Sequence, residues 1–157
     1  MLDTLPAKMN ALRPILWGGL LAGAMDITAA FVTSGLHGRG PVRVLHAIAS
    51  GLLGADSFQG GAATASLGAA LHFLIALGAA AVYWAASRWL KLLVRQPVVC
   101  GLLYGLAVYF FMNLVVLPLS AVPFKVTFTP AGLAEGLTIH MLCVGLPISL
   151  VTRRFSS

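Results

Sequence analysis

The chain has 157 residues, of which 59% are hydrophobic and only 9% charged, and its mean hydropathy is +0.95. A water-soluble domain of this length cannot bury so large an apolar fraction, so the composition excludes a soluble globular protein and indicates a membrane protein. The formal net charge is +6, but the Lys and Arg residues stand at the ends of apolar runs. There they indicate membrane topology and not nucleic-acid binding.

Four apolar segments are each long enough to cross a bilayer as a helix, and they predict a single all-α membrane domain over residues 1–157. The predicted spans are 14–36, 62–89, 97–117 and 130–152. Pro14 fits the first turn of the first span, and Pro118 is expected to end the third. The amphipathic segment 41–54 is too short to cross, so it is predicted as an interfacial or re-entrant helix, with both alternatives open.

The basic residues near the span ends are distributed unequally between the two sides of the membrane. One side has both termini and the loop after the second span, with Lys8, Arg13, Arg88, Lys91, Arg95, Arg153 and Arg154. The opposite side has Arg39, Arg43 and Lys125. Because cytoplasmic loops carry an excess of Lys and Arg, both termini are predicted to be cytoplasmic.

A weak internal repeat links the two halves of the chain. The segment Gly19–Gly23 recurs as Gly101–Gly105 at an offset of 82, and Gly68–His72 parallels Gly136–His140 at an offset of 68. The difference between the offsets equals the length of the 41–54 insertion. Two tandem helical hairpins, related by an axis along the membrane normal, would explain this pattern. Chance matching in a chain rich in Gly, Leu and Ala is the alternative.

Small residues share a helix face with the ionisable residues of the spans, and such faces are where membrane helices approach one another. The glycines predicted to pack helices in this way are Gly19, Gly23, Gly68, Gly101, Gly105, Gly132 and Gly136. Asp26, His72 and His140 are therefore predicted to point into the bundle, each roughly 15 Å from the outer end of its span. A carboxylate at this depth needs a partner, so Asp26 is predicted to pair with one or both histidines, with Asn113 nearby.

Three further polar residues, Glu135, His46 and Asp56, lie nearer the outer side and are predicted to line an outer vestibule. Together with the central cluster they would suit a proton-linked or small-solute pathway, since intramembrane Asp and His can exchange protons. The first alternative is a structural or partner-binding membrane subunit, in which the same polar groups fix helix register. Homodimer and larger membrane complex both stay open, and the lipid bilayer is the expected surrounding.

The second alternative is a redox subunit that holds haem b through His72 and His140, or a metal through these two histidines and Asp26. Neither HxxE nor HExxH occurs, so no metal site is predicted, and no cofactor is expected outside the haem alternative. The chain also lacks GxSxG and the phosphate-binding GxxxxGKS, so the sequence does not predict an enzyme.

Three segments resemble a widespread group of small bacterial four-span inner-membrane proteins. They are NLVVLPLSA over 113–121, IASGLLG over 48–54 and LHF over 71–73. The resemblance implies a multi-pass protein of the bacterial inner membrane. It also implies roles beyond hydrophobicity for Pro118, Asn113 and His72, and it brings no activity to transfer.

Overall fold

The computed structural model describes residues 7–125 and 127–156, and within them it has helices and no strand. The helices are α1 (Ala7–Leu36), α2 (Pro41–Leu53), α3 (Gly61–Trp89), α4 (Leu92–Arg95), α5 (Pro97–Phe111), α6 (Leu117–Leu119), α7 (Pro130–Ile139) and α8 (Leu146–Arg154). Three further helical segments connect some of these helices. They are the 3₁₀ helix η1 (Gly54–Gln59), which is wound more tightly than an α-helix, and the π-helices η2 (Met112–Val116) and η3 (His140–Gly145), which are wound more widely.

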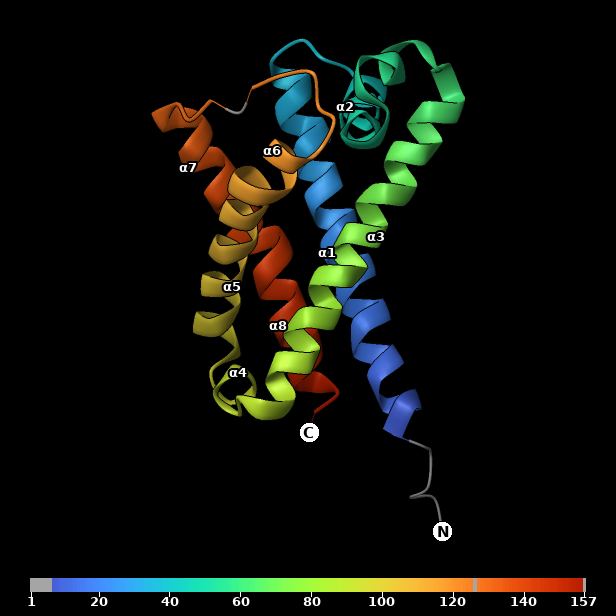
Figure 1. Cartoon of the computed structure of the whole chain (residues 1–157). Coiled ribbons are helices and arrows are strands. Elements are labelled where there is room, and N and C mark those ends of the chain that lie inside the picture. Colours follow the sequence, from blue (N-terminus) through green and yellow to red (C-terminus); the bar gives the residue numbers. More distant parts are fainter. Residues whose placement is uncertain (1–6, 126, 157) are drawn as a thin grey trace.

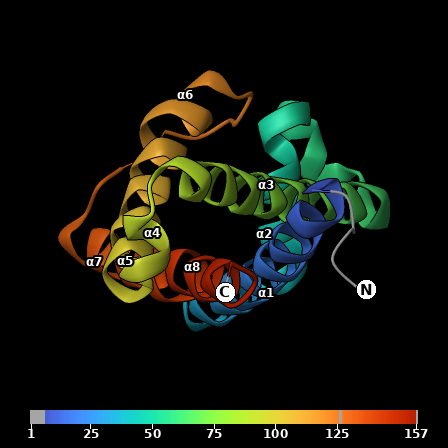
Figure 2. The ribbon, with the colours of Figure 1, turned by 90° about the horizontal axis from the view of Figure 1, so that it is seen from below.

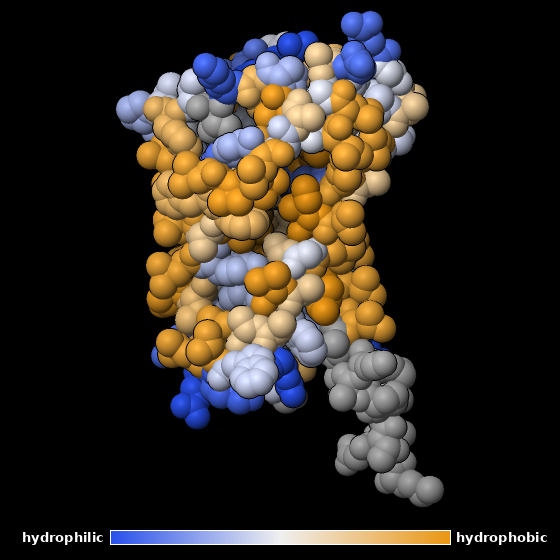
Figure 3. Space-filling model, in the orientation of Figure 1, coloured by the Kyte–Doolittle hydropathy of each residue, from blue (hydrophilic) through white to orange (hydrophobic). Residues whose placement is uncertain are grey.

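Four continuous helical units in this description are long and apolar enough to cross a membrane. They are Leu12–Leu36, Gly61–Trp89, Pro97–Leu119 and Pro130–Arg154. Apolar side chains cover the middle of the face shown in Figure 3, and hydrophilic ones gather at its two ends. The predicted all-α bundle of four spans, with a short helix between the first two, is confirmed. The chain is an integral membrane protein.

The four spans run side by side, with α2 at one end of the bundle and α4 at the other (Figure 1). We call these the α2 end and the α4 end. Viewed along the bundle, α8 lies between α1 and α5, while α3 runs along the opposite side (Figure 2). Helix α1 packs extensively on α3 and α8, and α5 packs on η3 and α8. By contrast, α3 and α5 scarcely touch each other.

Glycines allow the closest approach between α5 and the last span. A Cβ atom on Gly105 would overlap the carbonyl oxygen of His140, and one on Gly145 would overlap that of Gly101. In the first hairpin a Cβ on Gly19 would lie 2.8 Å from Leu77 Cα, and one on Gly23 would lie 2.8 Å from the Phe73 ring. Backbone therefore meets backbone in the second hairpin, as expected for small-residue packing in lipid.

Two other predicted packing glycines face neighbouring elements. A Cβ on Gly68 would overlap the carbonyl of Leu45 in α2, and one on Gly136 would overlap the Tyr109 ring of α5. Gly132 differs from the prediction, because a Cβ there would meet only Thr129 Oγ1, at 3.0 Å. Thr129 caps α7, so Gly132 lies in an exposed first turn where no other helix approaches.

The contacts within the two hairpins follow the offsets of the predicted repeat. The partners Gly19 and Leu77 correspond, at offsets of 82 and 68, to Gly101 and Gly145, which also face each other. Gly23 and Phe73 correspond in the same way to Gly105 and Met141, another facing pair. This agreement supports the duplication, which stays a prediction.

Two prolines lie within helices that they were expected to start or end. Helix α1 begins at Ala7, so Pro14 lies inside it, because the apolar pattern marks the part that crosses the membrane and not the full helix. The third span continues through Pro118 to Leu119. The wide η2 turn precedes Pro118, and η3 precedes Pro147 in the same manner. Proline has no N–H to donate to the preceding turn, and a π segment accommodates that missing bond without ending the helix.

Candidate functional site

Asp26 of α1 and His72 of α3 meet within the spans. The Nε2 atom of His72 lies 4.0 Å from Oδ2 of Asp26, and the two side chains are 13% and 21% exposed, respectively. The same Nε2 lies 2.9 Å from the carbonyl oxygen of Gly23. Gly23 has no side chain, so α3 can approach α1 closely enough for the imidazole to reach this carbonyl. One imidazole nitrogen thus joins the first two spans.

This geometry accommodates two protonation states of His72. A neutral imidazole with its hydrogen on Nε2 donates to the Gly23 carbonyl, and 4.0 Å to the carboxylate is too long for a second hydrogen bond. A protonated imidazole keeps that bond and is also attracted to the Asp26 carboxylate. The bond to the Gly23 carbonyl is thus compatible with either state of the imidazole.

Asp26 also faces the last span. Met25 and Thr28, which flank Asp26 on α1, line a crevice together with Cys143 of η3. Helix α1 packs on η3 at this level of the bundle. The carboxylate is therefore placed between two neighbouring spans, as the small-residue pattern predicted.

His140 and Asn113 belong to a different group, centred on Tyr109 of α5. The Nδ1 atom of His140 lies 2.9 Å from the Gly136 carbonyl oxygen, and its ring centroid lies 5.2 Å from that of Tyr109. The amide of Asn113 donates to the Tyr109 carbonyl oxygen over 2.8 Å. The predicted cluster of four residues is thus divided, and the described residues include no group of three His, Cys, Asp or Glu placed to hold a metal ion.

The reason for this division is the identity of the neighbouring helix. Gly136 and His140 share one face, as predicted, and that face does point into the bundle. It meets Tyr109 of α5, however, and not Asp26 of α1. Helical spacing predicts whether a face points inward, but it does not say which neighbour the face will meet.

The three predicted vestibule residues lie at the α2 end but do not act together. His46 is buried, and its Nε2 lies 2.9 Å from the carbonyl oxygen of Gly61 at the start of α3. The Ser57 hydroxyl donates to the His46 carbonyl over 3.0 Å. Asp56 in η1 and Glu135 in α7 are both exposed. His46 therefore fastens α2 to the beginning of α3, while the two acids lie on the surface.

A feature that sequence reasoning missed is a groove between α3 and α5. Its upper part, on the α2 side of Tyr104, is a cavity of about 490 Å³ that is lined almost wholly by apolar groups. The lining includes Gly78, Ala79, Val82, Tyr104, Val108 and Met112. A second cavity of about 320 Å³ continues toward the α4 end past Tyr104 and is lined by Tyr83, Leu90, Leu93 and Leu103, among others. The sequence does contain one sign of this groove, the run of small residues that begins at Gly78 in α3. The glycines of α5, Gly101 and Gly105, face the last span and not this run, so α5 does not pack closely against it.

Comparison of the chain with models of protein families, with curated proteins and with solved structures found no match. Its function is therefore inferred from the arrangement of its own residues.

Proposed function

We propose that this protein is a structural or partner-binding membrane subunit, whose intramembrane polar side chains hold the spans in register. The observation that carries the proposal is the bond from His72 Nε2 to the Gly23 carbonyl, 2.9 Å long, which joins α1 to α3. Tyr104 joins α5 to α3 in the same way, because its hydroxyl donates to the Ala79 carbonyl over 2.7 Å. In hydrocarbon such bonds satisfy groups that have no water to bind.

The cavities along the spans favour this structural role over solute conduction. Both parts of the groove between α3 and α5 are lined almost wholly by apolar groups. The crevice beside α1, which Met25, Thr28, Ile139 and Cys143 help to line, is also mostly apolar. A polar solute or a water chain needs polar partners along its path, and these surfaces offer few.

A proton-linked pathway is the second candidate, and one observation favours it. The carboxylate of Asp26 and the imidazole of His72 lie 4.0 Å apart and are 21% and 13% exposed, respectively, so neither is fully sealed. Intramembrane Asp and His pairs of this kind serve as proton relays in pumps and transporters. The pair could bind a proton in place, and Glu135 and Asp56 at the α2 end would supply outer acceptors.

Proton flux and stability distinguish the two candidates. The full chain would be reconstituted into liposomes containing a pH-sensitive dye, with Asp26→Asn as the variant and Thr138→Val as the control. Thr138 is exposed and bonds only within its own helix, to Ala134 O. The structural role predicts no flux above that of empty liposomes, and a lower unfolding free energy for His72→Phe, which removes the bond to the Gly23 carbonyl. Flux in the wild type that Asp26→Asn abolishes at unchanged stability would establish the pathway instead.

We also propose that the α4 end faces the cytoplasm of a bacterial inner membrane. The exposed basic residues at this end are Arg13, Arg88, Lys91, Arg95, Arg153 and Arg154, whereas Arg39, Arg43 and Lys125 lie toward the α2 end. The excess supports this orientation by the positive-inside rule. A green fluorescent protein fused at the C-terminus should fluoresce, and alkaline phosphatase fused there should be inactive. Active phosphatase at that position would reverse the orientation.

A further inference from the structure

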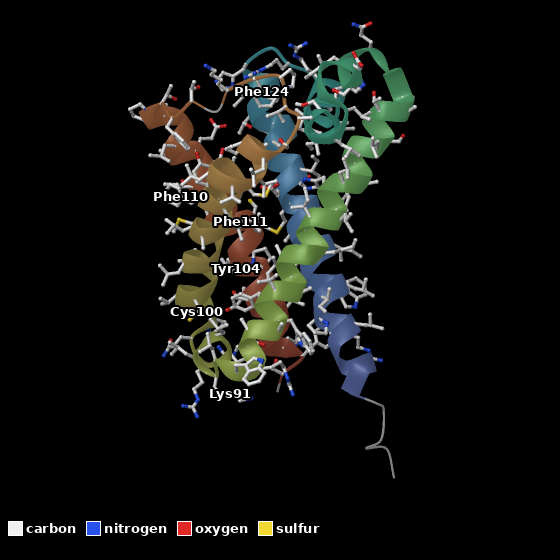
Figure 4. The ribbon with its side chains drawn as sticks, in the orientation of Figure 1. Lys91, Cys100, Tyr104, Phe110, Phe111 and Phe124 are labelled. Atoms are coloured by element: carbon white, nitrogen blue, oxygen red, sulfur yellow. The ribbon has the colours of Figure 1, made fainter. Side chains whose placement is uncertain are left out.

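The groove between α3 and α5 is open along the flank of the bundle. Figure 3 shows this face hollowed between the two helices, and Figure 4 shows Tyr104 reaching across from α5. Its hydroxyl bonds to Ala79 of α3 over 2.7 Å, and its ring packs edge-on against Tyr83 with centroids 4.9 Å apart. The two tyrosines thus form the floor of the groove, and apolar side chains form its walls.

The size of the groove fits a chain better than a helix. Its two parts have volumes of about 490 and 320 Å³, on either side of Tyr104. A helix is about 10 Å across, so against an open groove of this size it could insert side chains but not its backbone. A flexible hydrocarbon chain can follow the groove past Tyr104. Position within the spans makes lipid the molecule that is present there at the highest concentration.

Charge identifies the kind of lipid. The lower part of the groove is lined by Leu90 and Leu93, and the exposed residues Arg88, Lys91 and Arg95 each lie within two positions of one of them in the chain. The sequence has no acidic residue between positions 56 and 135, so the segment that carries these three cations has no carboxylate of its own. Basic clusters at the ends of spans attract anionic lipid headgroups. The lower end of the groove therefore has the charge complementary to a phosphate.

We propose that this groove binds one anionic phospholipid, with an acyl chain between α3 and α5 and its phosphate at Lys91 and Arg95. The acyl chain would cover the apolar lining, and the headgroup would lie at the α4 end. This site does not depend on Asp26 or His72, so it holds whichever role that pair has.

Native mass spectrometry of the purified full chain in detergent tests the site. The probes are phosphatidylglycerol and phosphatidylcholine with identical acyl chains. We expect phosphatidylglycerol to bind more tightly than phosphatidylcholine. Lys91→Gln and Arg95→Gln each remove one charge, and each should weaken the affinity for phosphatidylglycerol about fivefold. The matched control is the pair Arg39→Gln and Arg43→Gln at the α2 end, which should leave binding unchanged.

A second variant tests the acyl-chain part independently of charge. Gly78 lines the groove, and a Cβ atom there would meet no neighbouring element within 4 Å, so Gly78→Phe places a ring in the groove without a clash at its Cβ. This variant should weaken the binding of both lipids and leave the unfolding free energy of the protein unchanged. Equal binding of the two lipids, unaltered binding by Gly78→Phe, or a dimer of the chain in place of the lipid adduct would each overturn the proposal.

Discussion

His72 and Asp26 face each other from neighbouring spans, with 4.0 Å between Nε2 and Oδ2. The imidazole is anchored by the Gly23 carbonyl at 2.9 Å, so it stands close to the carboxylate without forming a direct hydrogen bond to it. The arrangement gives a costly intramembrane carboxylate a partner that can carry the opposite charge. The interaction energy of the pair can be measured.

Replacement of His72 by Phe should destabilise the bundle by about 1–3 kcal/mol, because it removes the bond that joins α3 to the Gly23 carbonyl of α1 and leaves the Asp26 carboxylate without its neighbour. The additional change Asp26→Leu removes the unpaired charge, so the double variant should recover part of that loss. Unfolding free energies in mixed micelles, arranged as a double-mutant cycle, give the coupling energy, expected at about 0.6–1.7 kcal/mol. Strictly additive effects would show that the pair does not interact.

The close crossing of α5 and η3 predicts a clear contrast between two glycines. Gly105→Ala places a methyl group against the backbone of His140 and should cost about 1–3 kcal/mol by overpacking. Gly78→Ala places the same group in open space and should change stability by less than about 0.5 kcal/mol. Thermal unfolding in one detergent measures both. Equal losses would mean that the α5–η3 contact does not limit stability.

Sequence periodicity was sufficient for the spans, the helix at 41–53 and the pairing of Asp26 with His72. These features depend on local apolar length and on two spans that follow each other closely in the chain. It could not place His140, because its inward face could meet either α1 or α5, and only the packed bundle shows that it meets Tyr109. The spacing argument expected His140 to converge on Asp26, whereas the structure places it beside Tyr109, because spacing within one helix does not identify the neighbouring helix.

Pro118 and the groove were missed for related reasons. The rule that proline ends a helix assumes α-helical bonding, whereas the η2 turn before Pro118 is a π-helix. Such a turn is a response to the proline and leaves no separate mark in the sequence. The groove arises because α3 and α5 both pack on α8 but meet each other only through side chains such as Tyr104. The spacing of residues within one helix does not reveal such a relationship among three helices.

Tyr104 is predicted to set the spacing of α3 and α5. Tyr104→Phe removes the 2.7 Å bond to Ala79 and should lower the unfolding free energy by about 0.6–1.7 kcal/mol, the range for such bonds between membrane helices. The matched control is Thr138→Val, whose lost bond lies within a single helix and which should have a smaller effect. Unfolding in mixed micelles again provides the measurement. An effect no larger than that of the control would show that α8 alone holds the two helices.

The docking of α2 depends on a buried hydroxyl. Ser57 is fully buried, and it donates to the His46 carbonyl over 3.0 Å, while its own carbonyl accepts from Thr64 over 2.7 Å. Ser57→Ala should therefore cost about 0.5–1.5 kcal/mol and loosen α2 in particular, since that bond joins η1 to α2.

Hydrogen exchange resolves this effect by segment. Amides over 41–53 should exchange faster in Ser57→Ala, while those of α1 and α8 keep their wild-type rates, because the lost bond does not reach them. Thr138→Ala is the control, since the exposed Thr138 hydroxyl bonds to Ala134 of its own helix over 2.7 Å. Faster exchange throughout the bundle would instead mean that α2 unfolds only together with the spans, and that its attachment through Ser57 and His46 is part of one cooperative unit.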